Sequence, residues 1–275
     1  MAHLRLEVSS AFSDDLMSFS GRQITPMPLR EEFEKTGNWL FRWRSYLPFF
    51  LLPFILIALH KAEYLERAFG DEAQTIWDVL CIIISFSGLL VRTLTIGWVP
   101  ENTSGRNTKA QVAASLNTKG IYSIVRHPLY FGNFLITLGM FLFIQVWWLV
   151  LLFISAFWLY YEKIMFAEEE FLRRKFGDHY IEWGSRTPAF LPAFSLWQKP
   201  DLRFSWRMVL KREYSTFLGI IVAFVALKFF GNLLAEGRFG FRITWAVFLI
   251  IGLLVFGVLH YLRRRTKWLH IPPNS

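Results

Sequence analysis

The sequence predicts an all-α fold, a polytopic transmembrane helical bundle of about six spans. Of its 275 residues, 54% are hydrophobic and 18% are aromatic, which is more apolar than an ordinary soluble domain. Lys and Arg are also distributed unevenly among the segments that connect the apolar stretches. The stretches long enough to cross a hydrocarbon core lie near 44–60, 76–99, 129–145, 146–166, 214–234 and 241–262.

The middle pair of stretches forms one apolar run, from Leu129 to Phe166, that is too long for a single span. Its centre holds one polar residue, Gln145, next to two tryptophans, which suit a membrane–water interface. We therefore expect a tight hairpin of two helices. The last two stretches carry no catalytic signal of their own, and we expect them either to shape a lateral entrance for a lipid or to pack against the core.

Positive charges indicate the orientation of the bundle, because short loops rich in Lys and Arg stay on the cytoplasmic side. In the first loop on the opposite side, Lys61 and Arg67 are outnumbered by acidic residues. We therefore expect both termini on the cytoplasmic side. The segments assigned to that side carry Arg42 and Arg44, then Arg106, Lys109, Lys119 and Arg126, then Arg173, Arg174, Lys175, Arg203, Arg207, Lys211 and Arg212, and finally Arg263, Arg264, Arg265 and Lys267.

Composition argues against several other classes of protein. The net charge of +9 follows from this topology and from attraction to anionic lipid, so we expect no nucleic-acid partner. The single cysteine, Cys81, lies in an apolar stretch, so we expect no disulfide and no metal site built on thiols. Residues 1–38 lack the apolar core of a signal peptide. The chain has no phosphate-loop or GxGxxG pattern, and we infer no obligate protein partner.

A first polar group, GIYSIVRHPLYFGN, stands immediately before the third apolar stretch. Pro128 disfavours a helical conformation at the preceding residue, His127, so we expect a bend where this stretch enters the membrane. The bend would hold Arg126, His127 and Tyr130 together at the cytoplasmic interface. The alternative is that the arginine extends to the interface, the tyrosine belongs to an aromatic belt and the histidine has no role.

A second polar group follows the fourth apolar stretch and contains Glu162, Glu168 and Glu169. Carboxylates are unfavourable near the carboxyl end of a helix unless they meet cations or hydroxyls. The alternative is an amphipathic helix whose acids pair with Arg173 and Arg174. The two polar groups bracket one helical hairpin, so they must lie at the same cytoplasmic end. Together they could hold a small zwitterion, with carboxylates binding an amine or hydroxyls and cations binding a carboxylate.

These motifs resemble the signature of the integral-membrane methyltransferases that include isoprenylcysteine carboxyl methyltransferase and phospholipid N-methyltransferases. The resemblance covers about residues 85–192, in the pattern GxYxxVRHPxYxG, then EExxLxxxFGxxY, then RxP. One departure is Trp183, where the family often has a second tyrosine. The matching positions are Gly120, Tyr122, Val125, Arg126, His127, Pro128, Tyr130 and Gly132, then Glu168, Glu169, Leu172, Phe176, Gly177 and Tyr180, then Arg186 and Pro188.

The resemblance implies an S-adenosylmethionine-dependent methyltransferase with its catalytic region on the cytoplasmic side. As catalytic residues it suggests Arg126, Tyr180 and Arg186. As residues that bind S-adenosylmethionine it suggests Tyr122, His127, Pro128, Tyr130, Gly132, Glu168, Glu169 and Leu172.

Two other classes of protein share some of these features. Membrane sterol reductases, which use NADPH, also carry an RHPNY-like segment, but an acidic residue usually follows their tyrosine shortly, whereas Phe131, Gly132 and Asn133 follow Tyr130 here. A scaffold or transporter would leave the two polar groups at one end unexplained, because a transporter concentrates polar residues at mid-membrane.

A third polar group points to the methyl acceptor. Arg92 lies inside the second apolar stretch, where an unpaired charge is costly, so we expect it to bind a nearby anion. The following loop adds Arg106 and Lys109 among small hydroxyl and amide side chains, which suit a phosphate. This loop also resembles bacterial relatives that methylate a lipid A phosphate. We therefore expect a membrane lipid acceptor, ranking a phosphate first, then a prenylcysteine carboxylate, then a phospholipid amine.

The predicted organisation has four parts. Residues 1–43 form a cytoplasmic arm, and residues 44–99 contain the first two spans. Residues 100–198 form the methyltransferase core, with the first motif, the hairpin and the EExxL segment. Residues 199–275 form a two-span extension with a basic tail.

Overall fold

The computed structural model describes residues 28–44, 46–60, 70–100, 113, 115–237 and 242–265. Regular structure in these residues is helical apart from one β-bridge between Gly120 and Gln198, which confirms the all-α prediction. The elements are α2 (Leu29–Trp43), α3 (Leu47–Phe50), α4 (Leu52–Leu59), α6 (Asp71–Gly97), η1 (Ile121–Ser123), α7 (Pro128–Phe143), α8 (Trp147–Phe176), α9 (Asp178–Arg186), η2 (Phe194–Leu196), α10 (Trp206–Glu236) and α11 (Ile243–Arg265).

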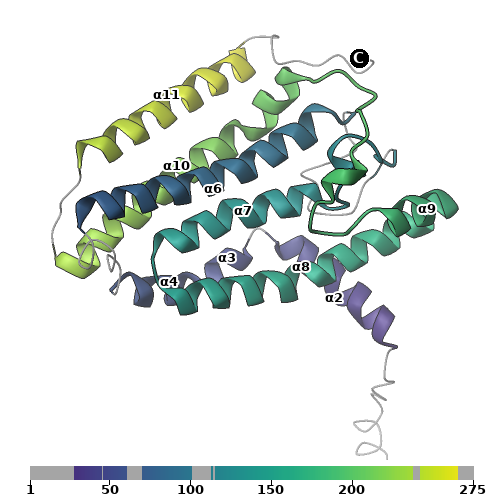
Figure 1. Cartoon of the computed structure of the whole chain (residues 1–275), viewed down its shortest axis with the longest axis horizontal. Helices are drawn as coiled ribbons and strands as arrows, with labels where there is room; N and C mark the ends of the chain where they lie inside the picture. Colours follow the sequence, from purple (N-terminus) through teal and green to yellow (C-terminus); the bar gives the residue numbers. More distant parts are fainter. Residues whose placement is uncertain are drawn as a thin grey trace, which may run out of the picture.

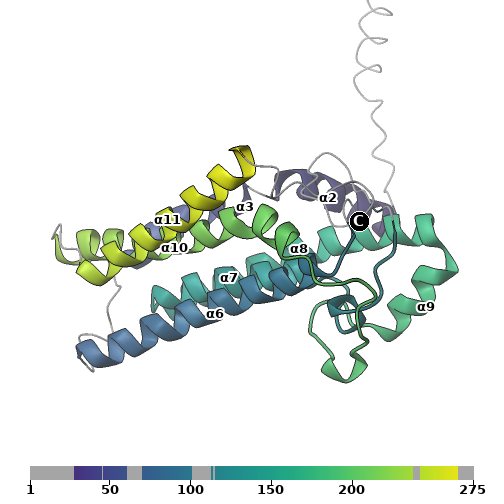
Figure 2. The same ribbon diagram turned by 90° about the horizontal axis from the view of Figure 1, so that it is seen from above.

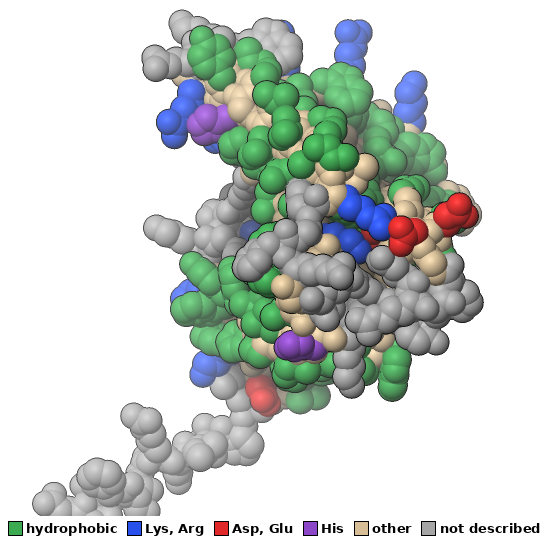
Figure 3. Space-filling view, turned by 90° about the vertical axis from the view of Figure 1, so that its left-hand side faces the viewer, with side chains coloured by type: hydrophobic (Ala, Val, Ile, Leu, Met, Phe, Trp, Pro, Cys, Tyr) green, Lys and Arg blue, Asp and Glu red, His purple; other side chains and the backbone are tan. Residues whose placement is uncertain are grey.

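Four described helices, α6, α8, α10 and α11, are long and apolar enough to cross a membrane, and α7 is a shorter apolar helix. The protein is therefore an integral membrane protein. Hydrophobic side chains cover much of the described surface at the end of the bundle opposite α9 (Figure 3). The first expected span, 44–60, contains two short helices, α3 and α4, separated by a turn at Leu51. The count of six spans stays a prediction.

The expected hairpin is confirmed, because α7 ends at Phe143 and α8 begins at Trp147. Gln145 lies in the turn with a φ of 63°, an uncommon value for a residue other than glycine. Its side-chain amide donates a hydrogen bond of 2.7 Å to Gln74 of α6, which helps to hold the turn in place. The second helix, α8, continues past the apolar run to Phe176. The acidic residues therefore lie on the same continuous helix as the fourth apolar stretch.

The long helices lie side by side in the order α11, α10, α6, α7 and α8 (Figure 1). Figure 2 shows α10 and α11 forming a layer against α6 and α7, with α9 at one end. The contact between α6 and α7 is close because Gly88 and Gly132 face each other, and a Cβ on either would collide with the backbone of the other helix. The Ser85 hydroxyl also donates to the carbonyl of Ile136, at 2.7 Å.

Candidate active site

The RHP segment bends into α7 as the sequence predicted. His127 is the N-cap of the helix, with φ −118° and ψ 61°, and Pro128 follows at its start, where no amide hydrogen is needed. A downstream segment runs beside this bend. The backbone N–H groups of Arg126 and His127 donate to the carbonyls of Pro188 and Ala189, at 2.9 and 3.1 Å. The RxP segment therefore supports the RHP segment through the main chain.

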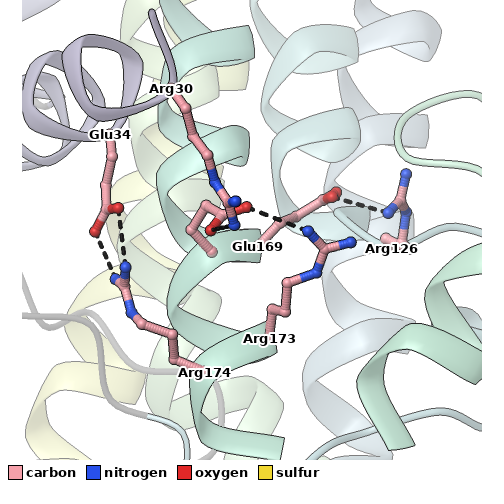
Figure 4. A network of polar contacts seen from close by, with 7 residues as sticks. Arg30, Glu34, Arg126, Glu169, Arg173 and Arg174 are labelled. Carbon is pink, nitrogen blue, oxygen red and sulfur yellow. Dashed lines mark hydrogen bonds and ion pairs between the residues drawn. The ribbon is translucent and has the colours of Figure 1, made fainter. Parts of the chain in front are cut away.

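The two polar groups meet at the end of the α7–α8 hairpin (Figure 4). The guanidinium of Arg126 donates to Glu169 at 2.8 Å, and His127 Nε2 lies 3.0 Å from the other oxygen of the same carboxylate. On its other side, His127 Nδ1 lies 3.4 Å from Glu168. One arginine and one histidine thus share two neighbouring carboxylates. Neither carboxylate forms an ion pair with Arg173 or Arg174 among the described contacts, so the amphipathic-helix alternative does not account for them.

His127 carries a positive charge more readily than an ordinary histidine. Its side chain is buried, and burial by itself lowers the pKa of the imidazole. Hydrogen bonds and charges from Glu168 and Glu169 outweigh that effect, so the pKa of His127 is raised. Protonation of His127 therefore strengthens its contacts with both carboxylates, while Arg126 pairs with Glu169.

Two tyrosines complete the cluster. The ring of Tyr130 stacks on His127 with centroids 5.7 Å apart, and its hydroxyl lies within hydrogen-bonding reach of Glu168. Tyr180 of α9 is buried beside Arg126 and Glu169, and burial raises the pKa of its hydroxyl. Neither the Tyr180 hydroxyl nor Arg126 Nε has an aligned hydrogen-bond partner in the part of the chain that the structure describes. The Tyr180 hydroxyl lies within reach of Glu169, whereas buried polar groups usually have partners, so Arg126 Nε is left with a hydrogen to donate to a ligand.

Other predicted residues lie around this cluster with different contacts. The carbonyl of Tyr122 accepts a hydrogen bond of 3.1 Å from the indole of Trp183, the residue that departs from the family pattern. Pro128 is buried at the start of α7, and Leu172 is half-buried on α8. Gly132 faces α6, where a Cβ would collide with Arg92 and Gly88. Helix packing therefore requires a glycine at this position, and its role in cofactor binding stays a prediction.

Of the residues expected near the acceptor, the two that the structure describes, Arg92 and Arg186, are each paired with a carboxylate of the protein. Arg186 is 73% exposed in its side chain and forms an ion pair with Glu182, one turn earlier on α9. Arg92 donates from Nε and Nη2 to both oxygens of Glu213, at 2.9 and 2.7 Å. The anion beside Arg92 is thus a protein carboxylate, which the sequence analysis had not identified. Arg106 and Lys109 lie outside the described residues.

A cavity of about 530 Å³ lies on the other face of α9, within the size range of small-molecule sites. Neither His127 nor Glu169 lines it. Its lining includes the expected residue Arg186, together with Trp183 and Ser123. The cavity has one carboxylate and one histidine of its own, Glu182 and His179. The cluster instead brings two neighbouring carboxylates together, which makes it the better candidate for binding a cationic ligand.

The N-terminal helix α2 contacts the same turn of α8, which the sequence analysis missed. Arg30 forms an ion pair with Glu170, and Figure 4 shows Glu34 next to Arg174. The successive residues Glu169 and Glu170 therefore pair in different directions, Glu169 with the RHP segment and Glu170 with α2. In the described ranges, no group of three or more His, Cys, Asp or Glu side chains could hold a metal ion.

Residues 80–179 match a protein-family model described as phospholipid methyltransferase. The matched segment contains most of α6, all of α7 and α8, and the start of α9. It therefore includes the RHP motif and both cluster glutamates. Helices α2, α10 and α11 lie outside it. The match begins before residue 100, where we expected the methyltransferase core to start.

Three curated proteins are similar to parts of this chain. The cobalt-zinc-cadmium resistance protein CzcN of Cupriavidus metallidurans is 33% identical over 127 residues, which are 44% of this chain and 56% of that protein. The nickel-cobalt-cadmium resistance protein NccN of Alcaligenes xylosoxydans xylosoxydans is 32% identical over 127 residues, 44% of this chain and 57% of that protein. The protein-S-isoprenylcysteine O-methyltransferase of Schizosaccharomyces pombe is 35% identical over 77 residues, 28% of this chain and 33% of that protein.

The chain thus spans little more than half the length of the two resistance proteins, and about a third of the methyltransferase. No solved structure matches it.

Proposed function

We propose, from the match of residues 80–179 to the phospholipid methyltransferase model and the similarity to an S-isoprenylcysteine O-methyltransferase, that this protein transfers a methyl group from S-adenosylmethionine to a membrane lipid. The observation that carries the proposal is the meeting of Arg126 and His127 with Glu168 and Glu169 at one end of the α7–α8 hairpin. This meeting puts cations and carboxylates within one family-matched segment.

The cluster fits S-adenosylmethionine by its chemistry. This cofactor carries a cationic sulfonium and amine, an anionic carboxylate and ribose hydroxyls, and when bound it supplies an activated methyl group. Glu168 and Glu169 would hold the amine or the hydroxyls, and Arg126 and His127 would hold the carboxylate. Arg126 Nε supports this fit, because it has no aligned partner among the described residues and can donate a further hydrogen bond. Tyr130 and Pro128 would shape the apolar wall beside them.

The residues of the site mainly need to align the two reactants and to keep water away. An acceptor that is already an anion needs no base, whereas an amine must lose a proton. We propose an anionic lipid oxygen, either a lipid phosphate such as a lipid A phosphate or a prenylcysteine carboxylate. The S-isoprenylcysteine O-methyltransferase among the relatives supports an oxygen acceptor. A phospholipid amine is the alternative, and the family description, phospholipid methyltransferase, keeps a phospholipid among the candidates.

The acceptor side would use fewer of the expected cations than the sequence suggested. Arg92 is engaged by Glu213 and Arg126 is assigned to the cofactor, so we propose the largely exposed Arg186 as the described arginine that contacts the acceptor. Arg106 and Lys109 remain proposed acceptor contacts. We further propose that the site and both termini face the cytoplasm, because Arg126, Arg173 and Arg174 lie at the end of the hairpin that carries the cluster. S-adenosylmethionine is a soluble cation, which supports the same assignment.

One experiment tests the function and ranks the acceptors. Purified protein in detergent is incubated with methyl-labelled S-adenosylmethionine and separately with lipid phosphate, prenylcysteine and phosphatidylethanolamine. We expect label on the phosphate or the carboxylate. Label confined to the amine lipid would overturn the acceptor ranking while keeping the methyltransferase. Absence of cofactor binding, measured by calorimetry, would refute the proposed function.

A further inference from the structure

A carboxylate from α10 is buried against the family-matched helices. The side chain of Glu213 is 5% exposed, and that of its partner, Arg92 of α6, is 13% exposed. The two form a bidentate ion pair, which fixes the plane of the guanidinium as well as neutralising it. Removing one partner of such a pair would leave an uncompensated charge inside the bundle. The arrangement of Arg92 therefore depends on a residue outside 80–179.

Arg92 also contacts the α7–α8 hairpin, so its fixed orientation affects that hairpin. Its remaining terminal nitrogen, Nη1, donates to the side-chain oxygen of Asn133, at 2.7 Å. Asn133 in turn lies within hydrogen-bonding reach of the Tyr161 hydroxyl on α8. One guanidinium thus uses Nε, Nη1 and Nη2 to join α6, α7 and α10. Three of its five N–H groups are thus committed to protein partners, and its charge is neutralised by Glu213.

The last link reaches the candidate active site. The ring of Tyr161 lies against that of Tyr130, with centroids 5.0 Å apart. Tyr130 is the residue that stacks on His127 and approaches Glu168. A continuous series of contacts therefore connects Glu213 to the cluster proposed to bind S-adenosylmethionine. The links from Glu213 to Asn133 and from Tyr161 to His127 are observed bonds, ion pairs or ring contacts, and Asn133 lies within reach of Tyr161. All these side chains are buried or half-buried.

We propose that Glu213 is a positioning residue for the cofactor site: by holding Arg92 it orients Asn133 and Tyr161, and through them the ring of Tyr130. This inference rests on the proposed function, because it assumes that the cluster around Tyr130 binds S-adenosylmethionine. It assigns a role to α10, which lies outside the segment that matches the family. The C-terminal helices then contribute to the site without touching the cofactor.

The test compares cofactor affinity with stability in a set of variants of the full chain. Glu213→Gln keeps the shape of the side chain but removes its charge. We expect the dissociation constant for S-adenosylmethionine, measured by calorimetry in detergent, to rise about tenfold, the change that ~1.4 kcal/mol produces. As a matched control, Asp71→Asn breaks the exposed ion pair of Asp71 with Arg242 at the other end of α6. We expect the control to bind the cofactor as the wild type does.

A double variant separates positioning from stability. The double variant Arg92→Met with Glu213→Leu has lost both charges. Proteins often keep their stability when apolar residues replace both members of a buried ion pair. We expect resistance to unfolding to recover while cofactor affinity stays low, because Asn133 has lost its donor. If affinity recovers together with stability, the pair is only structural and the inference fails. This variant also decides the question if Glu213→Gln does not fold.

Two further outcomes would also overturn the inference. Wild-type affinity in folded Glu213→Gln would show that the carboxylate does not position the site. A lower KM of that variant for a lipid phosphate would show that freed Arg92 binds the acceptor. If the wild type itself does not bind S-adenosylmethionine, the proposed function fails first, and this inference with it.

Discussion

Two helices outside the family-matched segment are fastened to it in opposite ways. Helix α2 meets α8 through ion pairs whose arginines, Arg30 and Arg174, are 61% and 57% exposed in their side chains. Helix α10 meets α6 through a pair whose side chains, Arg92 and Glu213, are 13% and 5% exposed. Both contacts are arginine–glutamate ion pairs. The arginines of the first contact are exposed to solvent, whereas both side chains of the second are enclosed in the bundle.

The difference concerns what holds each helix in place. Exposed ion pairs contribute little to stability, so packing must hold α2 against α8. Gly37 of α2, for example, lies directly against the backbone of Lys163 on α8. The Tyr160 hydroxyl adds a hydrogen bond of 2.7 Å to the carbonyl of Leu40 in α2. Breaking the buried pair costs much more folding free energy, because the partner that remains would be a charge without solvent or counterion. We therefore expect α10 to respond to single charge changes far more strongly than α2.

The largest effect is expected from Arg92→Met alone, which leaves Glu213 buried without its cation. The free energy of unfolding should fall by about 3–5 kcal/mol, the usual cost of breaking a buried pair. The measurement is the midpoint of unfolding during titration with a denaturing detergent. A loss no greater than that of Glu34→Gln would remove the contrast between the two contacts.

The next effect concerns the cluster that both contacts flank. Glu169→Gln and His127→Ala should each weaken binding of S-adenosylmethionine by roughly ten- to hundredfold, because a charge-assisted hydrogen bond contributes about 1.5–3 kcal/mol. Circular dichroism should show that both variants keep their helices. Wild-type affinity in both, measured by calorimetry, would place the cofactor elsewhere, with the cavity beside Trp183 and Arg186 as the next candidate.

The cluster should also depend on pH in a defined direction. The pKa of His127 is raised in the folded protein, so its interactions with Glu168 and Glu169 are complete below the ordinary value of 6.5. The stability that they contribute is lost as the pH rises through the raised pKa. Unfolding midpoints of the wild type minus those of His127→Gln should therefore decrease with rising pH. A difference that grows with pH would contradict the sign of this shift.

A smaller effect is expected where α2 meets α8. Glu170→Gln removes the carboxylate that lies between Arg30 and Arg173. The glutamate side chain is buried, whereas both arginines are exposed. Because the two arginines remain solvated, the loss should be about 1 kcal/mol. High salt should reduce the loss, since mobile ions screen exposed charges. A loss comparable to that of Arg92→Met would show that α2 is held by charge rather than by packing.

The smallest effect is expected for Glu34 and Arg174. The hydrogen bond from Arg174 lowers the pKa of Glu34 below its usual value of 4.5. Its contribution to stability is present above the usual value and is lost as the pH falls through the lowered pKa. A double-mutant cycle should give a coupling of about 0.5 kcal/mol at neutral pH and none in strong acid. Coupling that persists in acid would have to arise from packing.

The sequence predicted the parts of this protein that depend on local patterns. The length of the apolar run and the single Gln145 identified the α7–α8 hairpin, because a membrane fixes how long a span can be. Pro128 identified the bend at His127, because proline restricts the residue before it. These two features together predicted that the RHP segment and Glu169 share one end of the bundle.

Local patterns did not predict contacts between helices that are far apart in the sequence, as Glu213 illustrates. We expected the fifth span at 214–234, with the preceding charges in a loop, but α10 begins at Trp206, with Ser205 as its N-cap. Glu213 therefore lies two turns inside a helix, where its carboxylate can reach Arg92. Nothing in the local sequence distinguishes this glutamate from charges that flank a span, because its partner is 121 residues away.

The sequence by itself determined an apolar helical bundle with a cationic motif and an acidic motif at the ends of one hairpin. Tertiary structure alone decided which carboxylate meets which cation. It divided consecutive glutamates between the RHP segment and α2, and it gave Arg92 to α10 instead of leaving it for an acceptor. The physical reason is that periodicity fixes which residues share a face of one helix, whereas helix packing fixes which faces meet.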